Sequence, residues 1–303
     1  MRQLFTIAMF ILCSGCINQR VDLIVHHAQI YTVNNDFAMA EAMAIQDGKI
    51  VAIGTNDEIL KEYQSDSTVN AKGAIIYPGF IDAHAHFMGY GQSLYAVDLM
   101  FISSWEEVIQ RVKDFAVKHP GKGWIKGRGW DQNRFPGKAF PSNAELNALF
   151  PDRPVILERV DGHASIANDF ALQLAGVKPG QTIEGGQFTT QNGKLTGLLV
   201  DNAVGVVESH VPEATQADYK DWLTAAQQNC FATGLTTITD CGLSPSDIDQ
   251  VDALQKSGDL KMRLYVMLSD KPASYTSKYF IGGGYTTDRL SVKGVKVYGD
   301  GAL

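Results

Sequence analysis

The chain has 303 residues, of which 45% are hydrophobic, 10% aromatic and 19% charged. This is ordinary globular composition, and the length allows a full core and a second domain. A formal net charge of −7, with no local cluster of Lys and Arg to reverse it, argues against nucleic acid as a partner.

Residues 1–15 predict an export signal. Arg2 precedes a short apolar run over residues 4–12 and the small pair Ser14-Gly15, which is the order of a signal peptide. Small residues directly before Cys16 also resemble the bacterial lipoprotein box, although Cys13 stands where that box usually has Leu. We therefore expect an exported protein of the cell envelope, either periplasmic or held at the membrane as a lipoprotein acylated on Cys16. The alternative is a buried N-terminal strand.

Two cysteines remain beyond this leader. Cys230 and Cys241 have ten residues between them and show neither a CxxC spacing nor a partnering histidine pattern. We expect both to be buried as small hydrophobes, and a disulfide between them is the alternative in an oxidising compartment.

Residues 16–75 predict a small β-sandwich-like domain of short strands and tight turns. The run VDLIVHHAQIYTV (residues 21–33) is apolar and β-branched. The run AMAIQDGKIVAIG (residues 42–54) holds two such segments around Asp47-Gly48, a pair suited to a type I′ hairpin.

From residue 76 onward, predicted strands and helices alternate. A helix is expected after a capping box from Ser104 to Glu107, and a shorter one is expected to be capped by Ser142 and Glu145. Two further helices are expected at residues 215–234 and 244–258, and three strands are expected at residues 235–240, 263–268 and 292–299. This alternation predicts βαβ units and a parallel sheet, hence an α/β fold.

The stretch IIYPGFIDAHAHF (residues 75–87) ends in two histidines. Because side chains alternate along a strand, we expect Asp82, His84 and His86 to share one face and Ala85 to point the other way. Imidazoles spaced two residues apart lie roughly 6–7 Å from each other and can converge on one ion. The pattern therefore predicts half of a metal site, and the alternative is two polar residues where a strand ends.

PGFIDAHAHF, behind a β domain that contains DGKIVAIG, resembles the amidohydrolase superfamily. The details resemble its amidohydrolase 3 family, to which N-substituted formamide deformylase is related. Five further motifs occur in family order: GRGWDQNRF (127–135), VDGHASIAN (160–168), GKLTGLLVDNA (193–203), GLTTITDCG (234–242) and GVKVYGDGAL (294–303).

The resemblance implies a (β/α)8 TIM-type barrel that holds one or two divalent metal ions, of which zinc is the expected one. His84 and His86 match the ligand pair of the first barrel strand. Lys296 falls where the family has a lysine on the fourth strand that is often carbamylated, since a carbamate supplies oxygen ligands that a lysine cation cannot. Lys293 is a rival for this role, and a surface lysine at a strand end is the alternative.

The resemblance also implies that residues from about 91 to 229 form an insertion between the first and second barrel strands. Within it, Asp131 and His163 match residues that face the substrate in the family. Asp300, in a Gly-flanked turn after the fourth strand, is a further substrate-binding candidate. As sequence features alone, these residues are equally compatible with structural roles.

The implied reaction is hydrolysis of a carbon–nitrogen bond other than a peptide bond in an amide-type small molecule. A metal-activated water attacks, and an aspartate transfers the proton to the leaving nitrogen.

The last of the seven histidines is His210, so the family's later ligands have no counterpart in the sequence. We therefore expect residues 76–303 to be the first four strands of a longer barrel, truncated at the C-terminus, with weak metal uptake and no activity of its own. The alternative is a non-catalytic exported or lipid-anchored binding protein derived from an amidohydrolase. A reading frame that continues downstream and encodes the later ligands would favour the enzyme.

Overall fold

The computed structural model describes residues 18–269, 278–280 and 283–297. The expected export signal, the lipidation site Cys16 and the substrate-binding candidate Asp300 lie outside these residues. In the part of the chain that is described, no helix combines the length and the apolar content needed to cross a membrane. The chain divides into two compact units, residues 1–79 and 80–303, which are treated separately below.

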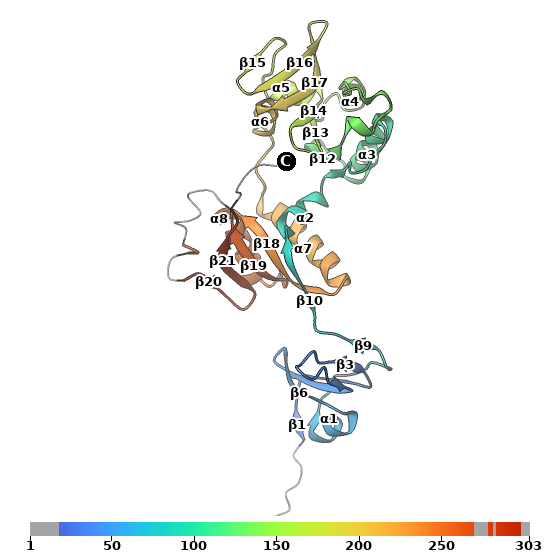
Figure 1. The fold of residues 1–303 in the computed structure, drawn as a ribbon, viewed down its shortest axis with the longest axis vertical. Coiled ribbons are helices and arrows are strands. Elements are labelled where there is room, and N and C mark those ends of the chain that lie inside the picture. The colour runs from blue at the N-terminus through green and yellow to red at the C-terminus, as the bar shows by residue number, and fades with distance from the viewer. Residues whose placement is uncertain (1–17, 270–277, 281–282, 298–303) are drawn as a thin grey trace, which may run out of the picture. The chain divides into compact units, whose positions relative to one another are not determined.

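The first unit is built almost entirely from short β-strands (Figure 1). Its described strands pair in the orders β6-β5-β2-β8, β4-β3-β9 and β1-β7. Ile24 of β2 and Ala42 and Ala44 of β5 are buried, and Ile59 of α1 packs against them. The elements are β1 (Gln19–Arg20), β2 (Leu23–His26), β3 (Gln29–Tyr31), β4 (Met39–Ala40), β5 (Ala42–Gln46), β6 (Lys49–Gly54), α1 (Asn56–Glu62), β7 (Tyr63–Gln64), β8 (Thr68–Asn70) and β9 (Ile75–Ile76).

The predicted hairpin between β5 and β6 is confirmed. Gln46 pairs with Lys49, so Asp47 and Gly48 form a two-residue turn. Their φ angles are 52° and 71°, and a type I′ turn requires positive φ at both central positions.

The second unit contains a parallel sheet of the kind found in (β/α)8 barrels. Its order is β10-β18-β19-β21-β20, in which the first four strands run parallel and β20 pairs antiparallel to β21. The strands are β10 (Phe80–Ala85), β18 (Leu235–Leu243), β19 (Arg263–Leu268), β20 (Tyr285–Thr286) and β21 (Leu290–Val295). The order agrees with the predicted partial barrel, because consecutive parallel strands lie side by side and helices follow them in the chain.

Three helices pack on this sheet: α2 (Phe87–Ser93), α7 (Gln216–Ala232) and α8 (Pro245–Lys256). The apolar layer between sheet and helices includes Ile238 and Val266 from the strands and Leu223 and Val251 from the helices, all of them buried. Cys230 and Cys241 are buried as free thiols, as expected from their spacing.

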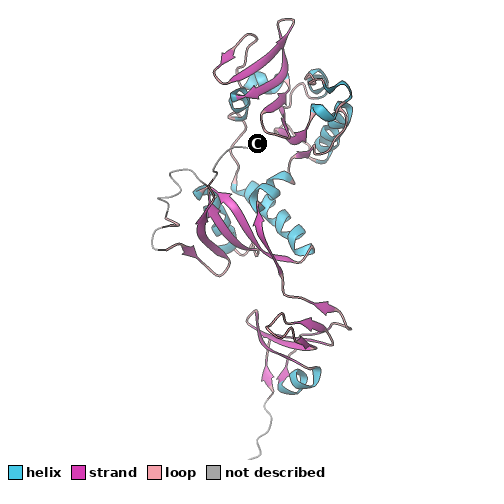
Figure 2. Cartoon of the chain, viewed as in Figure 1, coloured by secondary structure: helices cyan, strands magenta, loops and turns pink. Residues whose placement is uncertain are grey.

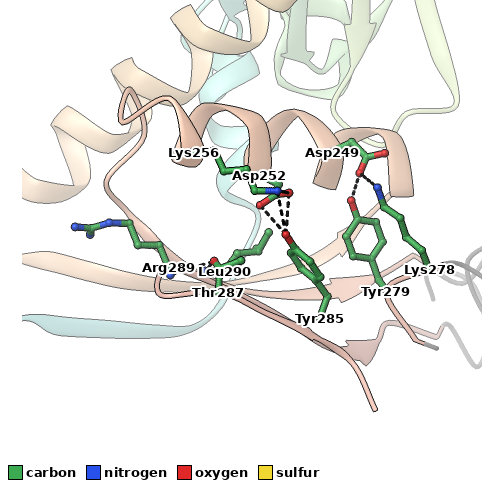
Figure 3. Close-up of polar contacts among 9 residues, drawn as sticks. All are labelled: Asp249, Asp252, Lys256, Lys278, Tyr279, Tyr285, Thr287, Arg289 and Leu290. Carbon is green, nitrogen blue, oxygen red and sulfur yellow. Dashed lines mark hydrogen bonds and ion pairs between the residues drawn. The ribbon is translucent and has the colours of Figure 1, made fainter. Parts of the chain in front are cut away.

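Side chains of α8 are joined to Tyr279 and Tyr285 by a polar network (Figure 3). The Tyr285 hydroxyl donates to the Asp252 carboxylate, with O···O distances of 3.0 and 3.1 Å. The hydroxyl of Tyr279, a buried residue, donates to Asp249 one turn earlier. These contacts hold Tyr279 and Tyr285 against the helix that precedes β19.

A second sheet lies between β10 and β18 in the sequence and is separate from the barrel sheet (Figure 2). Its order is β11-β12-β13-β14-β17-β16-β15, with β11 to β13 parallel and the other pairs antiparallel. Its elements are β11 (Val97–Asp98), α3 (Trp105–Lys118), β12 (Ile125–Trp130), the 3₁₀ turns η1 (Gln132–Arg134) and η2 (Pro136–Lys138), α4 (Ala144–Leu149), β13 (Val155–Arg159), β14 (Ala164–Ala167), α5 (Asp169–Leu174), β15 (Thr182–Ile183), β16 (Gly186–Gln191), β17 (Lys194–Asp201) and α6 (Asn202–Glu208).

Helix starts follow the sequence with one exception. The Ser104 side chain accepts from the Glu107 N–H at the start of α3, which is one half of the predicted capping box. The Glu107 carboxylate accepts from the Ser103 N–H, at 3.4 Å, instead of from the Ser104 N–H. The predicted cap of the next helix by Ser142 is wrong, because α4 has Asn143 at its N-cap position and no side-chain capping bond. The Asn143 amide instead donates to the Ala167 carbonyl, at 3.0 Å, and so ties the helix to β14.

Asn168 is fully buried, and four hydrogen bonds depend on its side chain. Its Oδ1 accepts from the N–H groups of Val155 (3.0 Å) and Ala171 (3.1 Å), while its Nδ2 donates to the carbonyls of Phe150 (2.8 Å) and Arg153 (2.9 Å). Asn168→Ala leaves these buried groups without partners, so we expect it to lower the free energy of unfolding by about 2–4 kcal/mol. Urea unfolding monitored by tryptophan fluorescence measures this change.

The control for Asn168 is the exposed Asn133. Asn133→Ala is expected to change the unfolding free energy by less than about 0.5 kcal/mol, as is usual for surface substitutions. Equal urea-unfolding midpoints for Asn168→Ala and Asn133→Ala would contradict the role given to Asn168.

Candidate metal centre

The two histidines of the motif lie at the end of β10, the first strand of the barrel sheet. Figure 1 labels this strand. His84 belongs to the strand, and His86 is the N-cap residue of α2. Their ring centroids are 6.2 Å apart and the ring planes are inclined by 75°. This separation agrees with the spacing expected from the sequence, and both side chains are accessible to solvent.

The local path of β10 differs from the predicted alternation. Asp82 pairs with Ile238 and Ala85 with Asp240, so β10 carries one extra residue opposite β18 and forms a β-bulge. The Asp82 Oδ1 accepts from the His84 N–H at 3.0 Å within this bulge. Asp82 and Ala85 line the same cavity of about 250 Å³, so the prediction that they face opposite sides of the strand is wrong.

The spacing of the two imidazoles can be compared with that of zinc ligands. Zinc binds imidazole nitrogen at about 2.0–2.1 Å, which places ring centres about 3.2 Å from the ion and at most about 6.4 Å from each other. Tetrahedral geometry brings the centres to about 5.2 Å. The observed 6.2 Å lies between the tetrahedral value and the upper bound. His84 and His86 therefore fit a divalent metal as two ligands of a larger set.

In the described ranges, no cluster of three or more His, Cys, Asp or Glu side chains has the arrangement of a metal site. Lys296, the lysine predicted to complete the ligands, follows β21 directly. Its backbone N–H donates to the Leu268 carbonyl at 2.8 Å, which extends the pairing with β19 to the carboxyl end of the sheet. Lys296 is half-buried and Lys293 exposed. The assignment of Lys296, rather than Lys293, as a carbamylated ligand stays a prediction.

Asp240 is a charged residue of this region that sequence reasoning missed. It lies in β18, is 1% exposed, and accepts a hydrogen bond from the Met88 N–H through Oδ2, at 2.9 Å. Burial raises the pKa of Asp240, while the Met88 N–H and the nearby His86 act in the opposite direction. The sequence signal that could have indicated Asp240 is the carboxylate at the end of the strand segment TTITD, because a buried charge requires partners.

Asp131 and His163, the predicted substrate residues, belong to the sheet of the insertion rather than to the barrel sheet. Asp131 follows β12 and accepts from the Asn133 N–H at 2.9 Å, which forms the start of η1. The Nδ1 of His163 lies 2.8 Å from Oδ1 of Asp201, at the end of β17. Asp201 has φ 49° and ψ −121°, a conformation that is costly for a residue other than glycine.

Arg159 links these two positions. Its guanidinium donates to both carboxylate oxygens of Asp161 and, at 3.2 Å, to the side chain of the buried Gln132 in η1. The hydrogen bonds from Arg159 lower the pKa of Asp161 to about 2, although partial burial opposes them. Asp161 also accepts from the His163 N–H at 3.1 Å. One charged network therefore fixes the loops that carry Asp131 and His163.

Comparison with known proteins decides the family. Residues 67–303 match the family described as Amidohydro_3, amidohydrolase family. The chain belongs to the amidohydrolase family. This membership agrees with the resemblance seen in the sequence and with the parallel sheet that carries the two histidines.

Three relatives show how far the likeness to other amidohydrolase family sequences and structures extends. The protein YtcJ of Bacillus subtilis is 34% identical over 215 residues, which cover 70% of this chain and 41% of YtcJ. N-substituted formamide deformylase of Arthrobacter pascens is 26% identical over 286 residues, which cover 90% of this chain and 52% of the deformylase. A solved structure described as an uncharacterized metal-dependent hydrolase, from Pyrococcus horikoshii, superposes with a TM-score of 0.70 at 27% identity, over 92% of this chain and 55% of that one. The chain thus spans about half the length of the relatives it matches.

Proposed function

We propose that this protein is a metal-dependent amidohydrolase that cleaves carbon–nitrogen bonds other than peptide bonds in amide-type small molecules. The observation that carries the proposal is the pair His84 and His86, 6.2 Å apart at the end of the first strand of a parallel barrel sheet. The names of two relatives support it, since one is a deformylase of N-substituted formamides and the other a metal-dependent hydrolase.

His84 and His86 would hold a divalent ion, for which zinc is our choice because imidazole nitrogen is among its preferred ligands. A carbamate on Lys296 would add an oxygen donor from the same end of the sheet. When bound, such an ion lowers the pKa of a coordinated water and polarises the amide carbonyl.

The remaining residues have positioning roles in this proposal. The bond from the His84 N–H to Asp82 holds the bulge that presents the His84 ring. The Arg159 network holds Asp131 and His163, which we propose contact the substrate amide.

The test uses the protein expressed at the full length of its coding sequence, with an N-substituted formamide as the probe. Release of formate is expected to stop after treatment with a chelator and to return when zinc is added, because the water nucleophile depends on the metal. A dipeptide of similar size is the control and is expected to stay intact. Formate release that persists in the chelator contradicts the proposal, and zinc binding without turnover of any amide favours a non-catalytic binding protein.

A further inference from the structure

Asp240 is a buried carboxylate beside one of the two histidines. It is 1% exposed, and it pairs across the β10–β18 ladder with Ala85, the residue before His86. Withdrawing a carboxylate from water costs several kcal/mol unless hydrogen bonds replace the lost hydration. The position of Asp240 therefore requires partners for both of its oxygens.

One oxygen of Asp240 holds the first turn of α2. Its Oδ2 accepts from the Met88 N–H at 2.9 Å. His86 occupies the N-cap position of α2 but makes no side-chain capping bond. Asp240 thus supplies, from the neighbouring strand, the acceptor that an N-cap side chain usually provides. The imidazole of His86 remains available for other bonds.

The other oxygen of Asp240, Oδ1, is buried and has no hydrogen-bond partner among the described residues. A buried acceptor without a donor costs about 1–3 kcal/mol. His86 directly follows Ala85, the residue that pairs with Asp240 across the ladder, and His86 lowers the pKa of this carboxyl. A histidine that binds a metal through one ring nitrogen commonly donates the N–H of the other nitrogen to a carboxylate.

We propose that Asp240 is the positioning residue of His86. Oδ2 holds the first turn of α2, and Oδ1 accepts the imidazole N–H of His86 when the other ring nitrogen binds the metal. This inference rests on the proposed function, because it assigns a partner to one of the proposed metal ligands. The bond selects which ring nitrogen carries the proton and fixes the direction of the nitrogen that faces the metal.

The test compares zinc affinity in wild-type, Asp240→Asn and Asp218→Asn forms of the full chain by competition with a chromophoric chelator. Asp240→Asn keeps a side-chain oxygen for the Met88 N–H but replaces Oδ1 by an amide that donates. Its zinc affinity is expected to fall about 10- to 100-fold, while slow hydrogen exchange of the Met88 amide shows that the helix start is intact. Asp218→Asn removes a carboxylate from the capping box of α7 and is expected to leave the affinity unchanged.

The outcomes distinguish the inference about Asp240 from the proposed function. Equal zinc affinity in wild-type and Asp240→Asn protein overturns this inference and leaves the proposed function in place. A wild-type chain that takes up no zinc overturns the proposed function and the inference with it.

A measurement on the zinc-loaded wild-type protein avoids dependence on the folding of any variant. In ¹⁵N-edited NMR, the ring N–H of His86 is expected to give an observable, slowly exchanging proton signal, because a buried oxygen accepts its hydrogen bond. Exchange as fast as in free imidazole overturns the inference.

Discussion

The variant His84→Ala/His86→Ala is expected to bind zinc at least about 100-fold more weakly than the wild-type chain, because it removes two nitrogen ligands at once. Each replacement alone is expected to cost about tenfold or more. Titration against a chromophoric chelator measures these changes. Since the rings of both residues are exposed, the unfolding midpoint is expected to stay within about 1 °C of the wild-type value.

The first unit offers a matched control. His26 and His27 also form a histidine pair, with ring centroids 4.8 Å apart, and His26→Ala/His27→Ala removes the same number of imidazoles. This double variant is expected to keep the wild-type zinc affinity. A comparable loss in the control would place the zinc outside the barrel sheet and contradict the assignment of His84 and His86.

Gly197→Ala is expected to cause the largest loss of stability of any single change considered. Gly197 lies in β17 with φ +85°, and a Cβ there would stand 2.4 Å from the Ala167 carbonyl oxygen and 2.5 Å from the Asn143 Cβ. The left-handed conformation costs about 1–2 kcal/mol for an alanine, and overpacking adds about 1–3 kcal/mol. We expect a total loss of about 2–5 kcal/mol, measured by urea unfolding.

Gly193 separates the two contributions to this loss. It has φ +75°, but a Cβ there would meet nothing within 4 Å. Gly193→Ala therefore reports the backbone cost alone and is expected to lower the unfolding free energy by only about 1–2 kcal/mol. Similar losses of unfolding free energy in Gly193→Ala and Gly197→Ala would show that the close contacts at Gly197 do not contribute to the loss.

The features that the sequence predicted well depend on neighbouring residues. The Asp47-Gly48 turn and the start of α3 at Ser104 are each specified within about four positions, so local patterns suffice. The spacing of His84 and His86 is likewise set locally, because only Ala85 separates them along the chain. The parallel sheet followed from the alternation of element types, which does not depend on the register between strands.

The features that the sequence did not reveal depend on residues far apart in the chain. The bulge between Asp82 and Ala85 exists only in the register of β10 against β18. Asn143 replaces the expected cap Ser142 because its amide bonds to Ala167, 24 positions away. The sequence predicts Asp240 only as the last residue of a strand, because its hydrogen-bond partner, the Met88 N–H, lies 152 positions earlier.

That separation of 152 positions affects the order in which the chain folds. Closing a flexible loop of this length costs about 4 kcal/mol of chain entropy. The insertion has its own apolar cores, and Val97 and Val211 from its two ends line one cavity, so once folded it brings its ends close together. The pairing of β10 with β18 is therefore expected to follow the folding of the insertion. A destabilising substitution such as Gly197→Ala lies in the other sheet. It would then still delay formation of the end of β10 that carries His84 and His86.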